Sequence, residues 1–118
     1  MLQLLDTKNH ARIATLTDNK FIICEVQDIL DIMGNLFPLD CKKFVVHEGN
    51  LHSDFFDLRT GLAGDILQKF SNYRVQLAVV GDFSKYESKS LRDFITESNK
   101  AKLIFFVPDM ESAILALQ

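Results

Sequence analysis

An almost unbroken apolar run at residues 75–80, VQLAVV, is the feature that most limits the folds open to this chain. A strand with one face in water alternates apolar and polar residues, whereas a strand buried on both faces is apolar nearly throughout. An amphipathic helical pattern precedes the run, through Leu62, Ile66, Leu67 and Phe70. Another short β-branched run, at residues 43–47, precedes that helix. A strand, a helix and a strand in this order predict a right-handed crossover between parallel strands.

The flanking segments extend this scheme. Helices are predicted at residues 25–36, 90–99 and 110–117, and a further strand at 103–107. Segments 2–6 and 11–17 are joined by the polar residues 7–10 and predict an antiparallel hairpin. The run at 21–24 fits either a strand end or a buried approach to the next helix. Residues 1–118 are therefore expected to form one α/β domain with a mixed sheet of about five strands.

The charge balance and the apolar runs restrict the partners. The chain has 13 Lys and Arg residues against 16 Asp and Glu residues, and its net charge of -3 repels a phosphate backbone, so we expect no nucleic acid partner. No apolar run approaches the roughly 20 residues of a membrane-spanning helix, so we expect no membrane partner. The first residues lack the basic and apolar segments of a signal peptide. We therefore expect a cytoplasmic protein in which Cys24 and Cys41 are reduced.

Polar residues gather at the predicted carboxyl ends of the parallel strands. These ends meet at one edge of a sheet, where open α/β proteins usually bind ligands. The candidate residues for a small-molecule or anion pocket there are His47, Glu48, Asp82, Ser84 and Lys89. The spacing of the His, Asp and Glu residues matches no compact metal motif, and the glycines complete no nucleotide-binding fingerprint. We therefore expect no metal and no cofactor, and we assign no catalytic residue.

A long block in the second half, FFDLRTGLAGDILQKFSNYRVQLAVVGDF, is followed by SKSLRDFITESN and LIFFV. From Phe55 onward the chain resembles a family of small bacterial proteins known only as a domain of unknown function. That resemblance supports the predicted fold and implies no particular reaction. Separately, the predicted element order is similar to that of the STAS domain of anti-sigma-factor antagonists, which implies a STAS-like regulatory module by analogy.

The STAS analogy directs attention to the turn before the central helix. In antagonists of that family, a hydroxyl residue before a glycine accepts a phosphate from a partner kinase, and Thr60 and Gly61 stand at the matching place. Asp57 lies one residue further from the hydroxyl than the family aspartate, and Arg59 replaces a small or polar residue. The resemblance therefore implies a partner-binding surface that contains Asp57, Arg59, Thr60 and Gly61.

Two roles for Thr60 remain open. A threonine before a glycine at a helix start is a natural N-cap, whose hydroxyl accepts a hydrogen bond from an unpaired backbone N–H. A phosphate there would meet the positive end of the helix dipole and the nearby Arg59.

The expected function is a non-enzymatic regulatory or protein-interaction module. The alternative is a small-molecule or anion-binding domain, with or without enzymatic activity, that uses the loops after the parallel strands. The partner is expected to be another protein or a second copy of the chain, paired through the exposed edge of the hairpin.

The helix predicted after Gly61 ends in a segment that carries Lys69, Asn72, Tyr73 and Arg74. We expect Asn72 and Tyr73 to fix the helix end, with both cations near its negative terminus. A patch for an acidic partner is the alternative.

Overall fold

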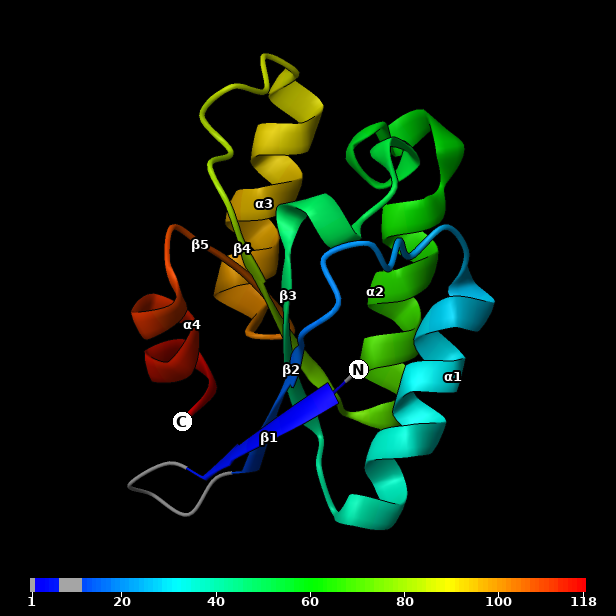
Figure 1. Cartoon of the computed structure of the whole chain (residues 1–118). Coiled ribbons are helices and arrows are strands. Elements are labelled where there is room, and N and C mark those ends of the chain that lie inside the picture. The colour runs from blue at the N-terminus through cyan, green and yellow to red at the C-terminus, as the bar shows by residue number, and fades with distance from the viewer. Residues whose placement is uncertain (1, 7–11) are drawn as a thin grey trace.

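The elements follow one another in the order that the sequence predicts. The computed structural model describes residues 2–6 and 12–118. Its strands are β1 (Leu2–Asp6), β2 (Arg12–Leu16), β3 (Lys43–His47), β4 (Gln76–Val80) and β5 (Ile104–Val107). Its α-helices are α1 (Val26–Leu36), α2 (Leu62–Tyr73), α3 (Lys89–Ala101) and α4 (Met110–Leu117). A hairpin is followed by alternating helices and strands (Figure 1), which confirms the α/β class. The predicted polar connection at residues 7–10 lies outside the described residues.

The described strands form a five-stranded sheet in the order β1-β2-β3-β4-β5. β1 runs antiparallel to β2, and each later pair of neighbours is parallel. Because the crossovers all advance in the same direction and share one hand, α1, α2 and α3 lie on one face of the sheet. The parallel strands therefore end at the same edge, and the loops that follow them meet there.

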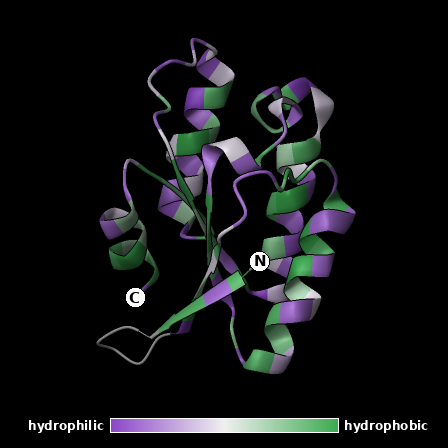
Figure 2. Cartoon of the chain, in the orientation of Figure 1, coloured by the Kyte–Doolittle hydropathy of each residue, from purple (hydrophilic) through white to green (hydrophobic). Residues whose placement is uncertain are grey.

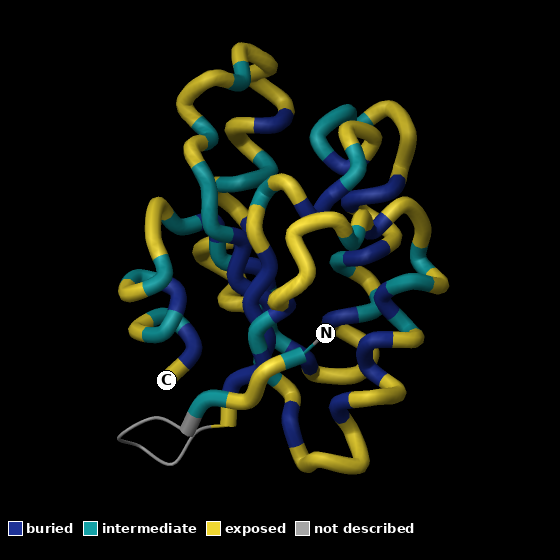
Figure 3. Tube along the Cα trace, in the orientation of Figure 1, coloured by how far each residue is buried: buried dark blue, intermediate teal, exposed yellow. Residues whose placement is uncertain are grey.

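Two hydrophobic layers cover the two faces of the sheet. The larger layer lies under α1, α2 and α3 and includes Phe44, Phe70 and Leu77, which have no exposed surface. The smaller layer lies under α4, where Ala78 of β4 clusters with Leu117. Buried residues run through the centre of the sheet (Figure 3), and α1 and α2 alternate between hydrophobic and hydrophilic stretches (Figure 2). The apolar run at residues 75–80 is thus buried on both faces, as predicted.

The first helix continues past its glycine and ends at Leu36, as its apolar pattern predicts. α1 passes Gly34 and ends at Leu36, and the chain continues as a 3₁₀ turn at Phe37–Leu39. Pro38 fits in this turn because the first residues of a helical turn have no partner for an N–H. The breaker at this point is therefore the proline turn and not the glycine.

The undecided run at residues 21–24 connects two loops. Ile23 forms an isolated parallel bridge with Leu51. Its N–H donates to the Asn50 carbonyl at 2.7 Å, and its carbonyl accepts from the His52 N–H at 3.0 Å. The segment after β2 is therefore tied to the segment after β3.

Candidate functional site

One carboxylate joins the loops after β3 and β4 at the carboxyl edge of the sheet. Oε2 of Glu48, which follows β3, accepts a hydrogen bond from the Tyr86 hydroxyl at 2.7 Å and forms an ion pair with Lys85 Nζ at 2.5 Å. The Glu48 side chain is only 17% exposed, so the negative charge lies mostly out of water. A charged hydrogen bond in such surroundings is stronger than a neutral one. We call Glu48, Lys85 and Tyr86 the edge latch.

Gly81 makes room for the edge latch. A Cβ at this position would lie 2.7 Å from Glu48 Cβ and 2.7 Å from Glu48 Oε1, which is closer than van der Waals contact allows. A larger residue at position 81 would therefore displace the Glu48 side chain. The glycine after β4 is required here by the close approach of a side chain.

The contacts of the edge latch move the pKa values of Glu48 and Tyr86 away from neutral pH. Burial is the largest influence on the pKa of Glu48 and would raise it, but hydrogen bonds from Lys85 and Tyr86, the charge of Lys85 and the Asp82 N–H together lower it. Burial and the hydrogen bond to Glu48 raise the pKa of Tyr86. Near neutral pH, Glu48 is therefore a carboxylate and Tyr86 a neutral phenol. Since general acid–base catalysis favours a pKa near the working pH, this arrangement fits a structural role.

Asn50 links the loops after β2 and β3 from a buried position. It is 2% exposed, and its Oδ1 accepts from the His47 N–H at 3.0 Å. Its Nδ2 donates to the carbonyl oxygens of Asp18 at 3.1 Å and Phe21 at 2.9 Å. The acceptor and both donors of the amide are therefore used, which fixes the position of the loop that carries Glu48.

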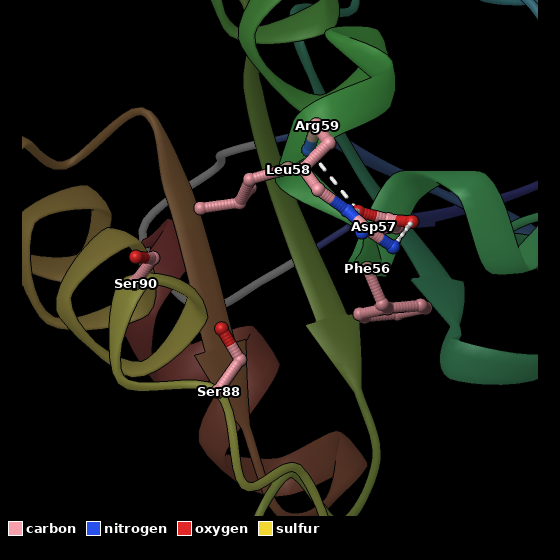
Figure 4. Close-up of a pocket in the computed structure, with 6 residues that line it drawn as sticks. All are labelled: Phe56, Asp57, Leu58, Arg59, Ser88 and Ser90. Atoms are coloured by element: carbon pink, nitrogen blue, oxygen red, sulfur yellow. Dashed lines mark hydrogen bonds and ion pairs between the residues drawn. The ribbon is translucent and has the colours of Figure 1, made fainter.

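A cleft of about 590 Å³ lies between the segment that leads into α2 and the start of α3. We call it the α2–α3 cleft, and Figure 4 shows the side chains around it. Its lining residues are Phe56, Asp57, Leu58, Arg59, Ser88 and Ser90. The first four come from the turns before α2, while the two serines stand at the start of α3. The cleft therefore combines apolar, charged and hydroxyl groups from two separate segments.

Asp57 and Arg59 form a planar pair on one wall of the α2–α3 cleft. Arg59 Nε donates to Asp57 Oδ1 at 3.0 Å, and Arg59 Nη2 donates to Asp57 Oδ2 at 2.9 Å. The hydrogen bond from the Arg59 side chain is the main reason that the pKa of Asp57 is lowered. The Arg59 side chain is nevertheless 91% exposed. Its orientation is thus set by one carboxylate, while most of its surface is accessible to a partner.

Thr60 closes the turn beside this pair. Its hydroxyl lies within donating distance of two carbonyl oxygens, that of Asp54 at 2.6 Å and that of Asp57 at 2.9 Å. Its Oγ1 also accepts from the Leu62 N–H at 3.3 Å. The N-cap position itself belongs to Gly61, whose φ of 80° favours glycine. The hydroxyl therefore pairs the N–H of the first residue of α2 from one position before the cap, which corrects the predicted N-cap by one residue.

Phe56 connects the α2–α3 cleft to the edge latch. Its ring stacks on the Tyr86 ring with centroids 4.9 Å apart and planes inclined by 14°. The Phe55 ring meets it edge to face at 5.1 Å, and the Phe83 ring lies 6.3 Å away. Phe55 is fully buried, so Phe56 is held between the core and the latch. The apolar wall of the cleft therefore has a fixed position.

The residues predicted for a pocket are divided among several contacts. Glu48 and Asp82 meet, because the Asp82 N–H bonds to the Glu48 carboxylate. The Ser84 hydroxyl and N–H both donate to Asp82 Oδ1, at 2.5 and 3.0 Å. His47 is exposed, and Lys89 forms an ion pair within α3. These five residues lie outside the described lining of the α2–α3 cleft, which instead includes Asp57 and Arg59 of the predicted partner surface.

Two features were not predicted from the sequence. They are the apolar half of the α2–α3 cleft and the Asn50 side-chain amide, which links the loops after β2 and β3. Phe56 and Leu58 flank Asp57 and Arg59 in alternation, and this alternation was the available signal for a mixed binding surface. Nothing in the sequence around Asn50 distinguishes it from an ordinary turn residue. Its role depends on carbonyl groups about thirty positions earlier in the chain.

Two further findings concern ligands and membranes. Within residues 2–6 and 12–118, no three His, Cys, Asp or Glu residues form a group that could hold a metal ion. In the same part of the chain, no helix has both the length and the apolar character needed to cross a membrane.

Comparison with known proteins identifies a family. Residues 8–117 match the family model described as a domain of unknown function, DUF4180. No curated protein and no solved structure matches the chain.

Proposed function

The chain belongs to the DUF4180 family, and we propose that it is a non-enzymatic binding module that receives part of a partner protein in the α2–α3 cleft. The observation that carries this proposal is the exposed Arg59 guanidinium, oriented by Asp57 beside an apolar wall. Arginine and aromatic residues in such settings contribute much of the binding energy at protein interfaces.

The state of the polar groups favours a protein partner over a small molecule. A small-molecule site usually directs several polar groups at its ligand. Here Asp57 is already paired with Arg59, and the Ser88 hydroxyl accepts from the Leu91 N–H at 3.2 Å. What the cleft offers to a partner is therefore mainly apolar surface, the outer face of one guanidinium and the Ser90 hydroxyl. An apolar side chain next to a carboxylate or a carbonyl would complement both.

The pKa values in the edge latch support the proposal of a non-enzymatic module. The pKa of Glu48 is lowered and that of Tyr86 is raised, so both pKa values move away from neutral pH. A proton-transfer pair would need the reverse. Their contacts instead fix the Phe56 wall.

The regulatory part of the proposal rests on Thr60. By analogy with the STAS domain, the turn before α2 is the place where a partner acts. A phosphate on Thr60 would remove the proton that its hydroxyl donates to the Asp54 or Asp57 carbonyl. The Asp57–Arg59 wall would then shift, and binding in the cleft would change with it.

Site-specific photocrosslinking in the native host tests the proposal. A photoreactive amino acid replaces Leu58, in the cleft, or Lys100, whose side chain is 71% exposed near the far end of α3. A protein crosslinked from position 58 and absent from position 100 is the expected result. Recovery of the same proteins from both positions would contradict the proposal.

Charge-reversal variants sharpen this experiment. Arg59→Glu and Lys100→Glu change the net charge equally, so only the first should abolish capture, provided that circular dichroism shows both to be folded. For the regulatory part, Thr60→Glu should reduce capture while Thr60→Ser keeps it. Equal capture by all variants would mean that the cleft is not the binding surface.

A further inference from the structure

An exposed apolar patch lies at the end of the molecule opposite the α2–α3 cleft. It consists of Phe37 and Leu39 in the turn after α1 and Tyr73 at the end of α2, which are 38%, 42% and 48% exposed. The Phe37 and Tyr73 rings contact each other with centroids 6.0 Å apart. Figure 1 shows the ends of α1 and α2 side by side at the bottom of the molecule, away from the start of α3. We call Phe37, Leu39 and Tyr73 the amino-edge patch.

The termination of α2 does not account for the exposed Tyr73 side chain. The N–H groups of Arg74 and Val75 both donate to the Phe70 carbonyl, so backbone groups close the helix end. Our expectation that Asn72 and Tyr73 would fix this end is replaced by that backbone closure. Tyr73 is instead exposed together with Phe37 in one patch, and exposed apolar patches mark interaction surfaces.

Hydrogen bonds order the turn that carries Phe37 and Leu39 in the amino-edge patch. Arg12 Nη1 donates to the Leu39 carbonyl at 2.6 Å, and the Cys41 N–H donates to the Leu36 carbonyl at 3.2 Å. These bonds fix the turn on both sides of Leu39. A surface that is already ordered loses less entropy when a partner binds.

Cations flank the patch in a chain whose net charge is negative. Lys69 lies one helical turn before Tyr73, on the same face of α2, and Arg74 follows Tyr73 directly. Neither cation forms an ion pair with another residue in the described part of the chain. The acidic group nearest in the chain is Asp40, next to Leu39. Two unpaired cations beside an aromatic pair complement an apolar side chain flanked by carboxylates.

We infer that the amino-edge patch binds a segment of a partner protein in which Asp or Glu residues flank a large apolar side chain. Phe37 and Tyr73 contact the apolar side chain, and Lys69 and Arg74 pair with the flanking carboxylates. This surface is separate from the α2–α3 cleft, so the domain can hold two partners at opposite ends. A second copy of this chain is the competing occupant, and the test below distinguishes it.

Short synthetic peptides titrated into the isotope-labelled full chain test the inference by NMR. One peptide carries a central Phe-Leu pair flanked by glutamates, and two matched peptides carry glutamines or lysines instead. We expect the glutamate peptide to shift the amide signals of the segments around Phe37 and Tyr73, and to bind more weakly as salt screens the charges. Tyr73→Ser and the double change Lys69→Glu with Arg74→Glu should each weaken binding by about tenfold or more.

The controls separate this inference from the proposed function. Lys100→Glu should leave binding of the glutamate peptide unchanged, and so should Leu58→Asp in the α2–α3 cleft. Equal binding of the three peptides, no binding of any, or shifts confined to the cleft would overturn the inference. So would shifts at the patch that grow with protein concentration in the absence of peptide, because they would identify a second copy as the occupant.

Discussion

Replacing Asn50 by alanine should destabilise the protein more than any comparable change on the surface. The substitution removes three hydrogen bonds, to the His47 N–H and to the carbonyls of Asp18 and Phe21. Each contributes about 0.5–1.5 kcal/mol net, and a buried group left without a partner costs more. We therefore expect a loss of about 2–4 kcal/mol in the free energy of unfolding. This is a large part of the free energy of unfolding of a typical domain, which is about 5–15 kcal/mol.

Urea unfolding followed by far-ultraviolet circular dichroism measures this loss, since the chain has no tryptophan for fluorescence. Asn72→Ala is the matched control, because Asn72 is exposed on α2 and alanine is a better helix former. Asn50→Asp keeps the acceptor for the His47 N–H but turns an oxygen toward two carbonyls, so it should cost at least as much as alanine. The reasoning is refuted if Asn50→Ala loses less than about 1 kcal/mol, or if Asn50→Asp is neutral.

Three further predictions concern the edge latch. Gly81→Ala should cost about 1–3 kcal/mol because of the clash with Glu48, whereas Gly64→Ala, where a Cβ meets no atom within 4 Å, should be neutral or stabilising in the same urea assay. The pKa of Glu48 is lower in the folded protein than its usual value of 4.5. The Glu48 carboxylate therefore stabilises the fold above pH 4.5, and this contribution is lost as the pH falls through the pKa of the folded state. The stability difference between the wild type and Glu48→Gln should therefore narrow in acid, and a constant difference would contradict it. Since the pKa of Tyr86 is raised from 10.0, the wild type should lose stability as the pH rises above that value, and Tyr86→Phe should lose less.

Hydrophobic patterning predicted the core elements closely and their ends less well. The strand at Lys43–His47 and the helix at Met110–Leu117 have the bounds expected from their apolar residues. α3 is longer than its apolar pattern. It starts after Ser88, whose hydroxyl accepts from the Leu91 N–H, and it ends at Ala101, because Lys102 has a φ of 60° that stops the helix. Caps and positive φ values depend on local hydrogen bonds. The spacing of apolar residues carries no information about those bonds, so it does not predict the exact helix ends.

The contacts at the carboxyl edge of the sheet were predictable where topology alone determines them. Glu48 and Asp82 meet because they follow adjacent parallel strands, which the strand order implies. The cleft wall was not predictable in the same way. Phe56 and Leu58 lie in 3₁₀ turns without a regular period, so their direction depends on how Phe55 packs in the core. Such irregular turns are fixed by tertiary contacts, and a single sequence gives no rule for them.

A chain of contacts joins the polar edge of the sheet to the proposed binding surface. The partly buried carboxylate of Glu48 accepts a hydrogen bond from the Tyr86 hydroxyl, and the Tyr86 ring stacks on Phe56 in the cleft wall. Loss of the carboxylate would free the Tyr86 ring and, through it, the apolar wall that faces a partner. The polar residues after β3 and β4 would then matter for binding without touching the partner. In this way a group of residues that suggests a small-molecule or anion pocket in the sequence can serve to position a cleft that lies beside it.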